Sequence, residues 1–108
     1  MKIEAAQRLQ ASNVAQTILQ QLGGSKFIAM TGAKNFVNSG DGIYFSIGKG
    51  AINKANKVEI KLHGNDTYEM KFYHLRGTNL KDLGSIDGLH AADLRRVFTL
   101  QTGLQTSI

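Results

Sequence analysis

Cysteine is absent from this chain of 108 residues. The protein can therefore form neither a disulfide framework nor a thiolate metal site, which fits a reducing compartment. No apolar run approaches the roughly 18 to 20 residues that a membrane-spanning helix needs. The N-terminus also lacks the basic region followed by an apolar stretch that marks a secretory signal. We therefore expect a cytoplasmic protein that has no membrane partner.

Charged residues are few, at 19% of the sequence, whereas hydrophobic residues make up 42% and are spread along the chain. Such a composition allows a hydrophobic core and argues against disorder. The length lies near the commonest domain size. We expect residues 1–108 to form a single domain.

Recognisable catalytic patterns are missing as well. The three histidines, His63, His74 and His90, show none of the spacings typical of a zinc site. There is no G-x-S-x-G nucleophile motif. The sequence therefore predicts a non-catalytic protein without metal or cofactor, and it leaves open an active site built from residues that are distant along the chain.

An N-terminal helix is predicted to begin at Ser12, whose hydroxyl can cap the first turn. Its apolar residues recur at intervals of four: Val14, Ile18 and Leu22. Gly23 and Gly24 supply a left-handed stop. Residues 3–10 are expected to extend the same helix towards the N-terminus.

Two short apolar runs bounded by turn residues predict strands, at residues 26–30 and 43–47. In the second run, alternation places Ile43, Phe45 and Ile47 on one face. Glycine-containing segments at residues 23–26 and 31–35 each place backbone amides near a lysine and are candidates for phosphate binding. Neither has the spacing of a P-loop, and a helix stop is the simpler interpretation of the first segment.

The clearest structural pattern is a hairpin over residues 57–75, with residues 64–66 as its loop. Pairing His63 with Thr67 makes both faces of the hairpin agree. The apolar pairs on one face would be Val58 with Phe72, Ile60 with Met70, and Leu62 with Tyr68. The charged pairs on the other face would be Lys61 with Glu69, and Glu59 with Lys71. The apolar pairs and the charged pairs independently favour the same strand register.

The stretch from residue 76 to residue 88 is rich in Gly, Asn, Asp and Ser and is predicted to be a surface connection. A closing helix follows and ends near Gly103. Its predicted inward residues are Leu94, Val97 and Phe98, and its outward residues are Arg95 and Arg96. The order helix, strands, hairpin, helix predicts an α+β fold, in which a small antiparallel sheet of about four strands carries the N- and C-terminal helices on one face.

Basic residues exceed acidic ones by 13 to 8, for a net charge of +5, which favours phosphate-rich partners. Several of them flank the predicted strands and loops: Lys26, Lys34, Lys49, Lys54, Lys57 and Arg76. If these loops converge at one end of the sheet, the lysines form a basic rim that contacts phosphates without reading bases. The alternative is a set of charged loops that only keep the protein soluble.

Tyr44 and Tyr73 alternate with the apolar residues of their strands and therefore point away from the main apolar face. On an exposed sheet their rings could stack on nucleic-acid bases. A second layer of structure or an oligomer interface would bury them equally well.

The chain resembles a family of small uncharacterised proteins encoded by bacteriophages and prophages. The likeness covers most of the chain and lies in residues 22–24, 27–36, 66–68, 98–99 and 102–104. The resemblance implies the cytoplasm of a bacterial host, and it transfers no activity to any residue.

Two functional hypotheses follow. The favoured one is a binding protein associated with DNA or RNA through the lysine rim. The alternative is a module that binds a host or phage protein, such as an inhibitor of a host defence complex or a structural protein that associates with itself. An edge strand offered to a second copy would give a homo-oligomer.

Overall fold

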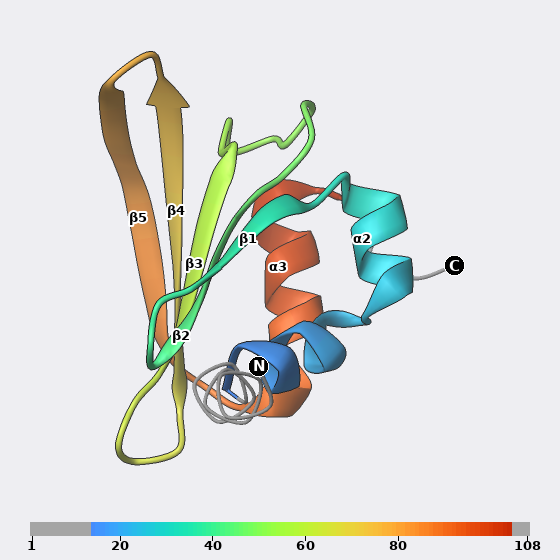
Figure 1. Ribbon diagram of the computed structural model, residues 1–108, viewed down its shortest axis with the longest axis vertical. Coiled ribbons are helices and arrows are strands. Elements are labelled where there is room, and N and C mark those ends of the chain that lie inside the picture. Colours follow the sequence, from blue (N-terminus) through green and yellow to red (C-terminus); the bar gives the residue numbers. More distant parts are fainter. Residues whose placement is uncertain (1–13, 105–108) are drawn as a thin grey trace, which may run out of the picture.

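The computed structural model describes residues 14–104 (Figure 1). A helix over residues 14–22 comes first. The remaining elements are α2 (Ser25–Thr31), β1 (Lys34–Asn38), β2 (Gly42–Ser46), β3 (Lys57–Leu62), β4 (Tyr68–Arg76), β5 (Asn79–Leu89), the short 3-10 helix η1 (Ala91–Asp93) and α3 (Leu94–Thr102). The strands form one antiparallel sheet in chain order.

All of these helices lie on the same face of the sheet (Figure 1). The predicted α+β fold is therefore confirmed, with five strands in place of about four. The opposite face, which we call the outer face, carries no further layer formed by residues 14–104. None of the helices in this part of the chain is long and apolar enough to cross a membrane.

The first helix ends where the sequence predicts. Ile18 and Leu22 are fully buried, and Val14 packs against the same core. Gly24 has a φ of 61°, a left-handed conformation that costs glycine little, and its N–H donates to the Leu19 carbonyl at 2.9 Å. The expected cap at Ser12 and the extension over residues 3–10 lie outside the described residues.

The predicted strand at residues 26–30 is wrong, because this segment forms the helix α2. The N–H of Ile28 donates to the Gly24 carbonyl, and the Thr31 hydroxyl donates to the Phe27 carbonyl at 2.6 Å. Phe27 and Thr31, four residues apart, are the buried residues of this helix. A short apolar run is compatible with a buried strand or a buried helix turn, and periodicity alone does not separate them.

The hairpin register is confirmed at every predicted pair. Val58 pairs with Phe72, Ile60 with Met70, Leu62 with Tyr68, Lys61 with Glu69, and Glu59 with Lys71. The N–H of His63 donates to the Thr67 carbonyl at 2.8 Å and closes the loop. The ion pairs among these four side chains form within each strand, between Lys61 and Glu59 in β3 and between Lys71 and Glu69 in β4.

The predicted surface connection at residues 76–88 is also wrong, because most of it is the strand β5. Arg76 pairs with Asn79, so only Gly77 and Thr78 connect β4 to β5. Register irregularities occur at two places along this pair. They put the inward apolar residues three positions apart instead of two: Leu83, Ile86 and Leu89. The strand also lies at the sheet edge and is mostly exposed, so it shows no alternating pattern.

The other edge strand, β1, was not predicted either. All of its residues are exposed, and Asn35 has a positive φ of 57° where the pairing with β2 is irregular. The strand therefore carries no apolar alternation that a sequence pattern could reveal.

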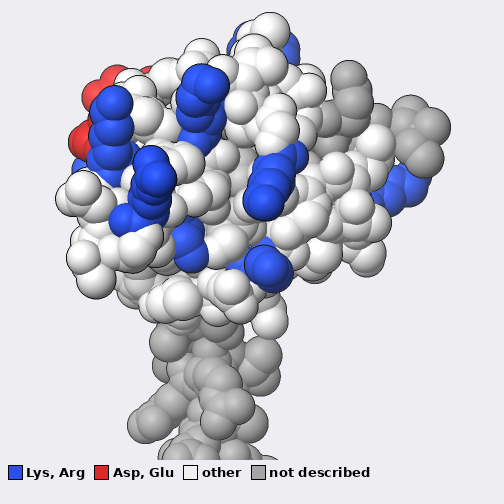
Figure 2. Space-filling model, turned by 90° about the horizontal axis from the view of Figure 1, so that it is seen from above, with Lys and Arg blue, Asp and Glu red and all other residues white. Residues whose placement is uncertain are grey.

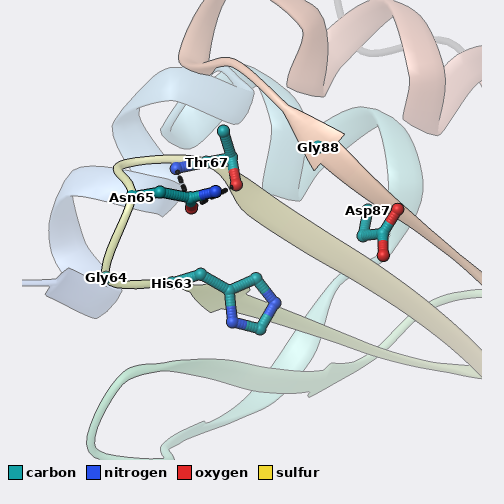
Figure 3. A pocket seen from close by; sticks show the side chains of 6 residues that line it. All are labelled: His63, Gly64, Asn65, Thr67, Asp87 and Gly88. Atoms are coloured by element: carbon teal, nitrogen blue, oxygen red, sulfur yellow. Dashed lines mark hydrogen bonds between the residues drawn. The ribbon is translucent and has the colours of Figure 1, made fainter.

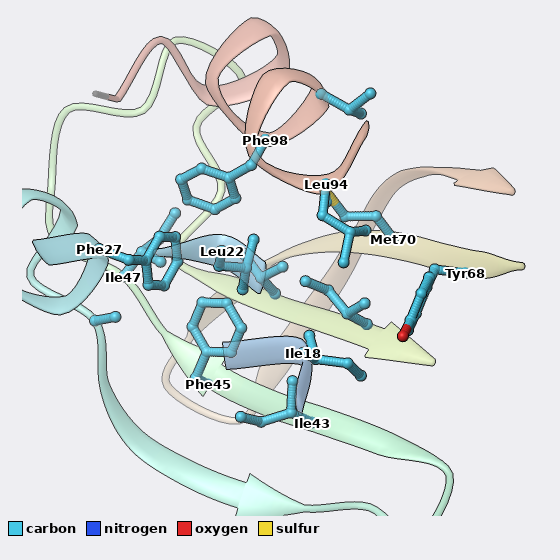
Figure 4. Packing of buried hydrophobic residues seen from close by; sticks show 14 of the residues in the cluster. Ile18, Leu22, Phe27, Ile43, Phe45, Ile47, Tyr68, Met70, Leu94 and Phe98 are labelled. Atoms are coloured by element: carbon cyan, nitrogen blue, oxygen red, sulfur yellow. The ribbon is translucent and has the colours of Figure 1, made fainter. Parts of the chain in front are cut away.

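The core lies between the sheet and the helices (Figure 4). Phe27 contacts Phe45 from β2 and Phe98 from α3 in edge-to-face geometry, with ring centroids 5.6 and 5.0 Å away. In α3, Leu94, Val97 and Phe98 are buried while Arg95 and Arg96 are exposed, and Gly103 ends the helix in a left-handed conformation, as predicted.

Candidate functional site

Antiparallel pairing gathers basic residues at one end of the sheet. Lys34 begins β1, Lys57 begins β3 and Arg76 ends β4, and these positions all lie at the same end. The loop between β2 and β3, which carries Lys49 and Lys54, lies there too (Figure 1). We call these residues the basic end. Three separate segments of the chain contribute to it: the start of β1, residues 49–57 and the end of β4.

Figure 2 looks onto this end and shows Lys and Arg side chains spread over its surface, with Asp and Glu side chains only at one margin. Lys81 in β5 pairs with His74 in β4 and adds a further positive charge close by. The sequence analysis missed Lys81 because its segment was not recognised as a strand. The opposite end of the sheet carries the acidic residues Asp41, Asp66 and Asp87. We call this opposite end the acidic end. The separation of charge is partial, because Asp82 in β5 pairs with Tyr73 and lies nearer the basic end.

Lys26 is the one predicted basic residue that the fold keeps away from the basic end. It lies in the first turn of α2, whereas the chain approaches the basic end only after this helix stops at Gly32. Its side chain is exposed. The expectation that Lys26 flanks a strand was wrong because residues 25–31 are helical.

Ser46, at the end of β2, lies between two lysines of the basic end. It pairs with Lys34 on one side and with Lys57 on the other. The Lys57 ammonium donates to the Ser46 hydroxyl and lies 5.9 Å from the centroid of the Tyr44 ring. A cation over an aromatic face is attracted by the ring quadrupole. This lysine is therefore held against the outer face and is not a freely moving surface charge.

Tyr44 and Tyr73 both lie on the outer face, as predicted, because Phe45 and Phe72 beside them point into the core. Their ring centroids are 6.4 Å apart, and the rings are half-buried and tilted by 56°. The Tyr73 hydroxyl donates to the Glu59 carboxylate at 3.4 Å.

Partial burial, and then the charge of Glu59, raises the pKa of both tyrosines above 10.0. The two hydroxyls therefore stay protonated at neutral pH and can donate hydrogen bonds. Together the two tyrosines present uncharged aromatic surface directly beside the lysines of the basic end.

The glycine amides of the two glycine-containing segments are not free. The N–H groups of Gly23 and Gly24 donate to carbonyls of the first helix. The N–H of Gly32 donates to Ile28, and the Thr31 carbonyl accepts from Gly48 at 2.8 Å. These glycines stop helices and allow close backbone packing, which explains them without a bound phosphate.

The histidines are separated in the structure. The ring of His63 lies 3.1 Å from the Glu69 carboxylate, and Nδ1 of His74 donates to the Lys54 carbonyl at 2.8 Å. His90 caps η1 together with Asp93, whose pKa is lowered by the His90 N–H and by Arg96. Within residues 14–104 no three His, Asp or Glu side chains are grouped so that they could hold a metal ion.

An open pocket of about 360 Å³ lies at the acidic end of the sheet (Figure 3). His63 and Asp87 come together here only because β5 pairs beside β4, so sequence spacing gives no sign of the pocket. The Thr67 hydroxyl donates to Asn65 at 2.7 Å and not to His63. The pocket therefore does not pair a nucleophile with a base.

An apolar groove of about 240 Å³ lies between the first helix and β1. Its lining includes Ala15, Leu19, Phe36, Val37 and Ile43. The exposed fraction is 36% for Phe36 and 53% for Val37, which is high for side chains of this type. Because β1 is an edge strand, backbone groups along the groove are also unpaired by the sheet.

Comparison with known protein families, with curated proteins and with solved structures finds no match to this chain. The resemblance to phage-encoded proteins therefore stays a prediction.

Proposed function

We propose that this protein binds nucleic acid non-catalytically through its basic end, in the cytoplasm of a bacterial host. The observation that supports this function is the gathering of basic residues from three chain segments at one end of the sheet: Lys34, Lys49, Lys54, Lys57 and Arg76. Lysines that served only for solubility would have no reason to converge at the end of the sheet opposite Asp41, Asp66 and Asp87.

The expected binding is electrostatic and largely independent of sequence. A protein that neutralises phosphates releases condensed counterions, so its affinity falls with salt in proportion to the number of contacts. If all residues of the basic end contact duplex phosphates, affinity should fall about 500-fold between 50 and 200 mM salt. The acidic end would be repelled, which orients the protein on the nucleic acid.

A pair of matched double variants tests the proposal. Lys34→Gln with Lys49→Gln removes two charges from the basic end, whereas Lys26→Gln with Arg95→Gln removes two exposed charges elsewhere. Net charge changes equally in both. Binding to labelled duplex DNA and RNA is measured by fluorescence anisotropy over a salt series.

We expect the first pair to lower the slope of log affinity against log salt by about 1.8 and the second pair to leave it unchanged. Equal losses from the two pairs would show that net charge alone drives binding. An absence of binding beyond a basic control protein would refute the proposal.

A second function, binding of a host or phage protein, is favoured by the apolar groove along β1. Phe36 and Val37 are exposed beside an unpaired strand edge, an arrangement suited to an added strand from another chain. A defence inhibitor or a self-associating structural protein would use such a surface. Sedimentation of the wild type and of Val37→Lys distinguishes self-association, which the lysine should abolish, from a monomer.

A further inference from the structure

The outer face of the sheet divides into two electrostatically different parts. Towards the acidic end, Glu59, Lys61, Glu69 and Lys71 alternate in sign and contact one another, so their charges balance locally. Towards the basic end, Lys34 and Lys57 flank Ser46, and the ion pairs found among residues 14–104 include neither lysine. Asp82 in β5 pairs with Tyr73 on the side away from these lysines. The aromatic pair Tyr44 and Tyr73 lies where the two parts meet.

We propose that this face binds single-stranded nucleic acid, with bases stacked on Tyr44 and Tyr73 and the backbone phosphates along Lys34 and Lys57. The inference rests on the proposed function and adds its substrate class. Charge complementarity favours nucleic acid over an apolar protein surface as the partner of this face. An apolar protein layer would leave Lys34 and Lys57 without counter-charges, whereas phosphates supply them.

A single strand fits the tyrosines because its bases are free to leave the stack. Every base has an aromatic face, so stacking on tyrosine tolerates all sequences. In a duplex the base faces are occupied by neighbouring bases, and only the phosphate backbone is available to the protein. The tyrosines therefore contribute to single-strand binding alone, whereas the basic end contributes to both.

Glu59 sets the orientation of the strand on the sheet. Its carboxylate lies beside both tyrosines, accepts the Tyr73 hydroxyl and is already paired with Lys61, so a phosphate over the centre of the face finds no free positive charge. The phosphates must then run on the lysine side, with the bases directed towards Glu59. A carboxylate at that position can accept a hydrogen bond from an exocyclic amine of a base.

The experiment uses the full chain and intrinsic tyrosine fluorescence. The sequence has three tyrosines and no tryptophan, and Tyr68 is buried, so Tyr44 and Tyr73 are the rings that a stacked base can quench. The probes are single-stranded DNA and RNA of the same length, an abasic strand with the same number of phosphates, and a duplex. The variants are Tyr44→Leu and Tyr73→Leu, and Tyr44→Phe and Tyr73→Phe serve as controls that keep the ring.

We expect the single strands to quench tyrosine fluorescence and the abasic strand not to do so. Each leucine variant should weaken single-strand binding about tenfold and leave duplex binding unchanged, while the phenylalanine variants bind like the wild type. Thermal melting of each variant checks that the fold is retained.

Unaltered single-strand affinity in both leucine variants, or equal binding of the abasic strand, would overturn the inference while duplex binding still supports the proposed function. Loss of single-strand and duplex binding together in folded leucine variants would also overturn it, because the tyrosines would then not act through stacking. If the wild type binds none of the probes, the proposed function itself fails.

Discussion

Replacement of Phe27 by alanine tests the packing of α2, the element that the sequence predicted wrongly. Phe27 is fully buried and contacts two other rings, Phe45 and Phe98. Truncation of a buried phenylalanine costs about 3 to 5 kcal/mol, and loss of two edge-to-face contacts places this site at the upper end of that range. Since a domain of this size is stable by only about 5 to 15 kcal/mol, the variant should lose about a third or more of its free energy of unfolding.

Urea unfolding followed by circular dichroism measures the effect. With a slope of about 1 to 3 kcal/mol per molar urea, the midpoint should fall by about 1.5 M or more. A loss of stability below about 1.5 kcal/mol would refute the reasoning, because it would place Phe27 outside the core.

Ala29 provides a control that separates a helix from a strand. In α2 its side chain is exposed, so Ala29→Lys should change stability by no more than about 0.5 kcal/mol. In a strand, Ala29 would share a face with Phe27, and a lysine there would be buried at a high cost. A large loss in this variant would therefore favour the strand.

Two further predictions concern the sheet. Gly42→Ala should be strongly destabilising in thermal melts, because the added Cβ would collide with the Ile60 carbonyl of the paired strand. The control Gly64→Ala adds a Cβ in open space and should melt like the wild type. In an ultraviolet titration, Glu59→Gln should lower the apparent pKa of the two outer-face tyrosines towards 10.0. The pKa of these tyrosines is higher in the folded than in the unfolded state. Their contribution to the free energy of unfolding should therefore be fully present below pH 10 and be lost as the pH rises through the folded pKa. This loss should be smaller in Glu59→Gln. An unchanged titration would show that Glu59 does not act on these hydroxyls.

The hairpin shows why part of the fold could be predicted. Its two faces carry independent information, apolar on one side and paired charges on the other, and a slip of one residue would spoil both. The closing helix could be predicted equally well, because Leu94, Val97 and Phe98 recur at helical spacing before a glycine stop. In such segments local sequence and tertiary burial agree.

The candidate site was predictable only as a set of residue types. Sequence reasoning named Lys34 and Lys57, and it placed Tyr44 and Tyr73 away from the core. It did not reveal Lys81, because the irregular pairing of β5 removes the alternation that identifies a strand.

The sequence by itself determined the apolar face and register of the hairpin, the stops of the first and last helices and the excess of positive charge, because each depends on residues that are close along the chain. Only the tertiary structure decided that residues 25–31 are a helix, that β5 completes the sheet, and that Lys26 stands apart from the basic end. These outcomes depend on which distant surfaces pack together, and burial against Phe45 and Phe98 outweighs any local preference of a seven-residue segment.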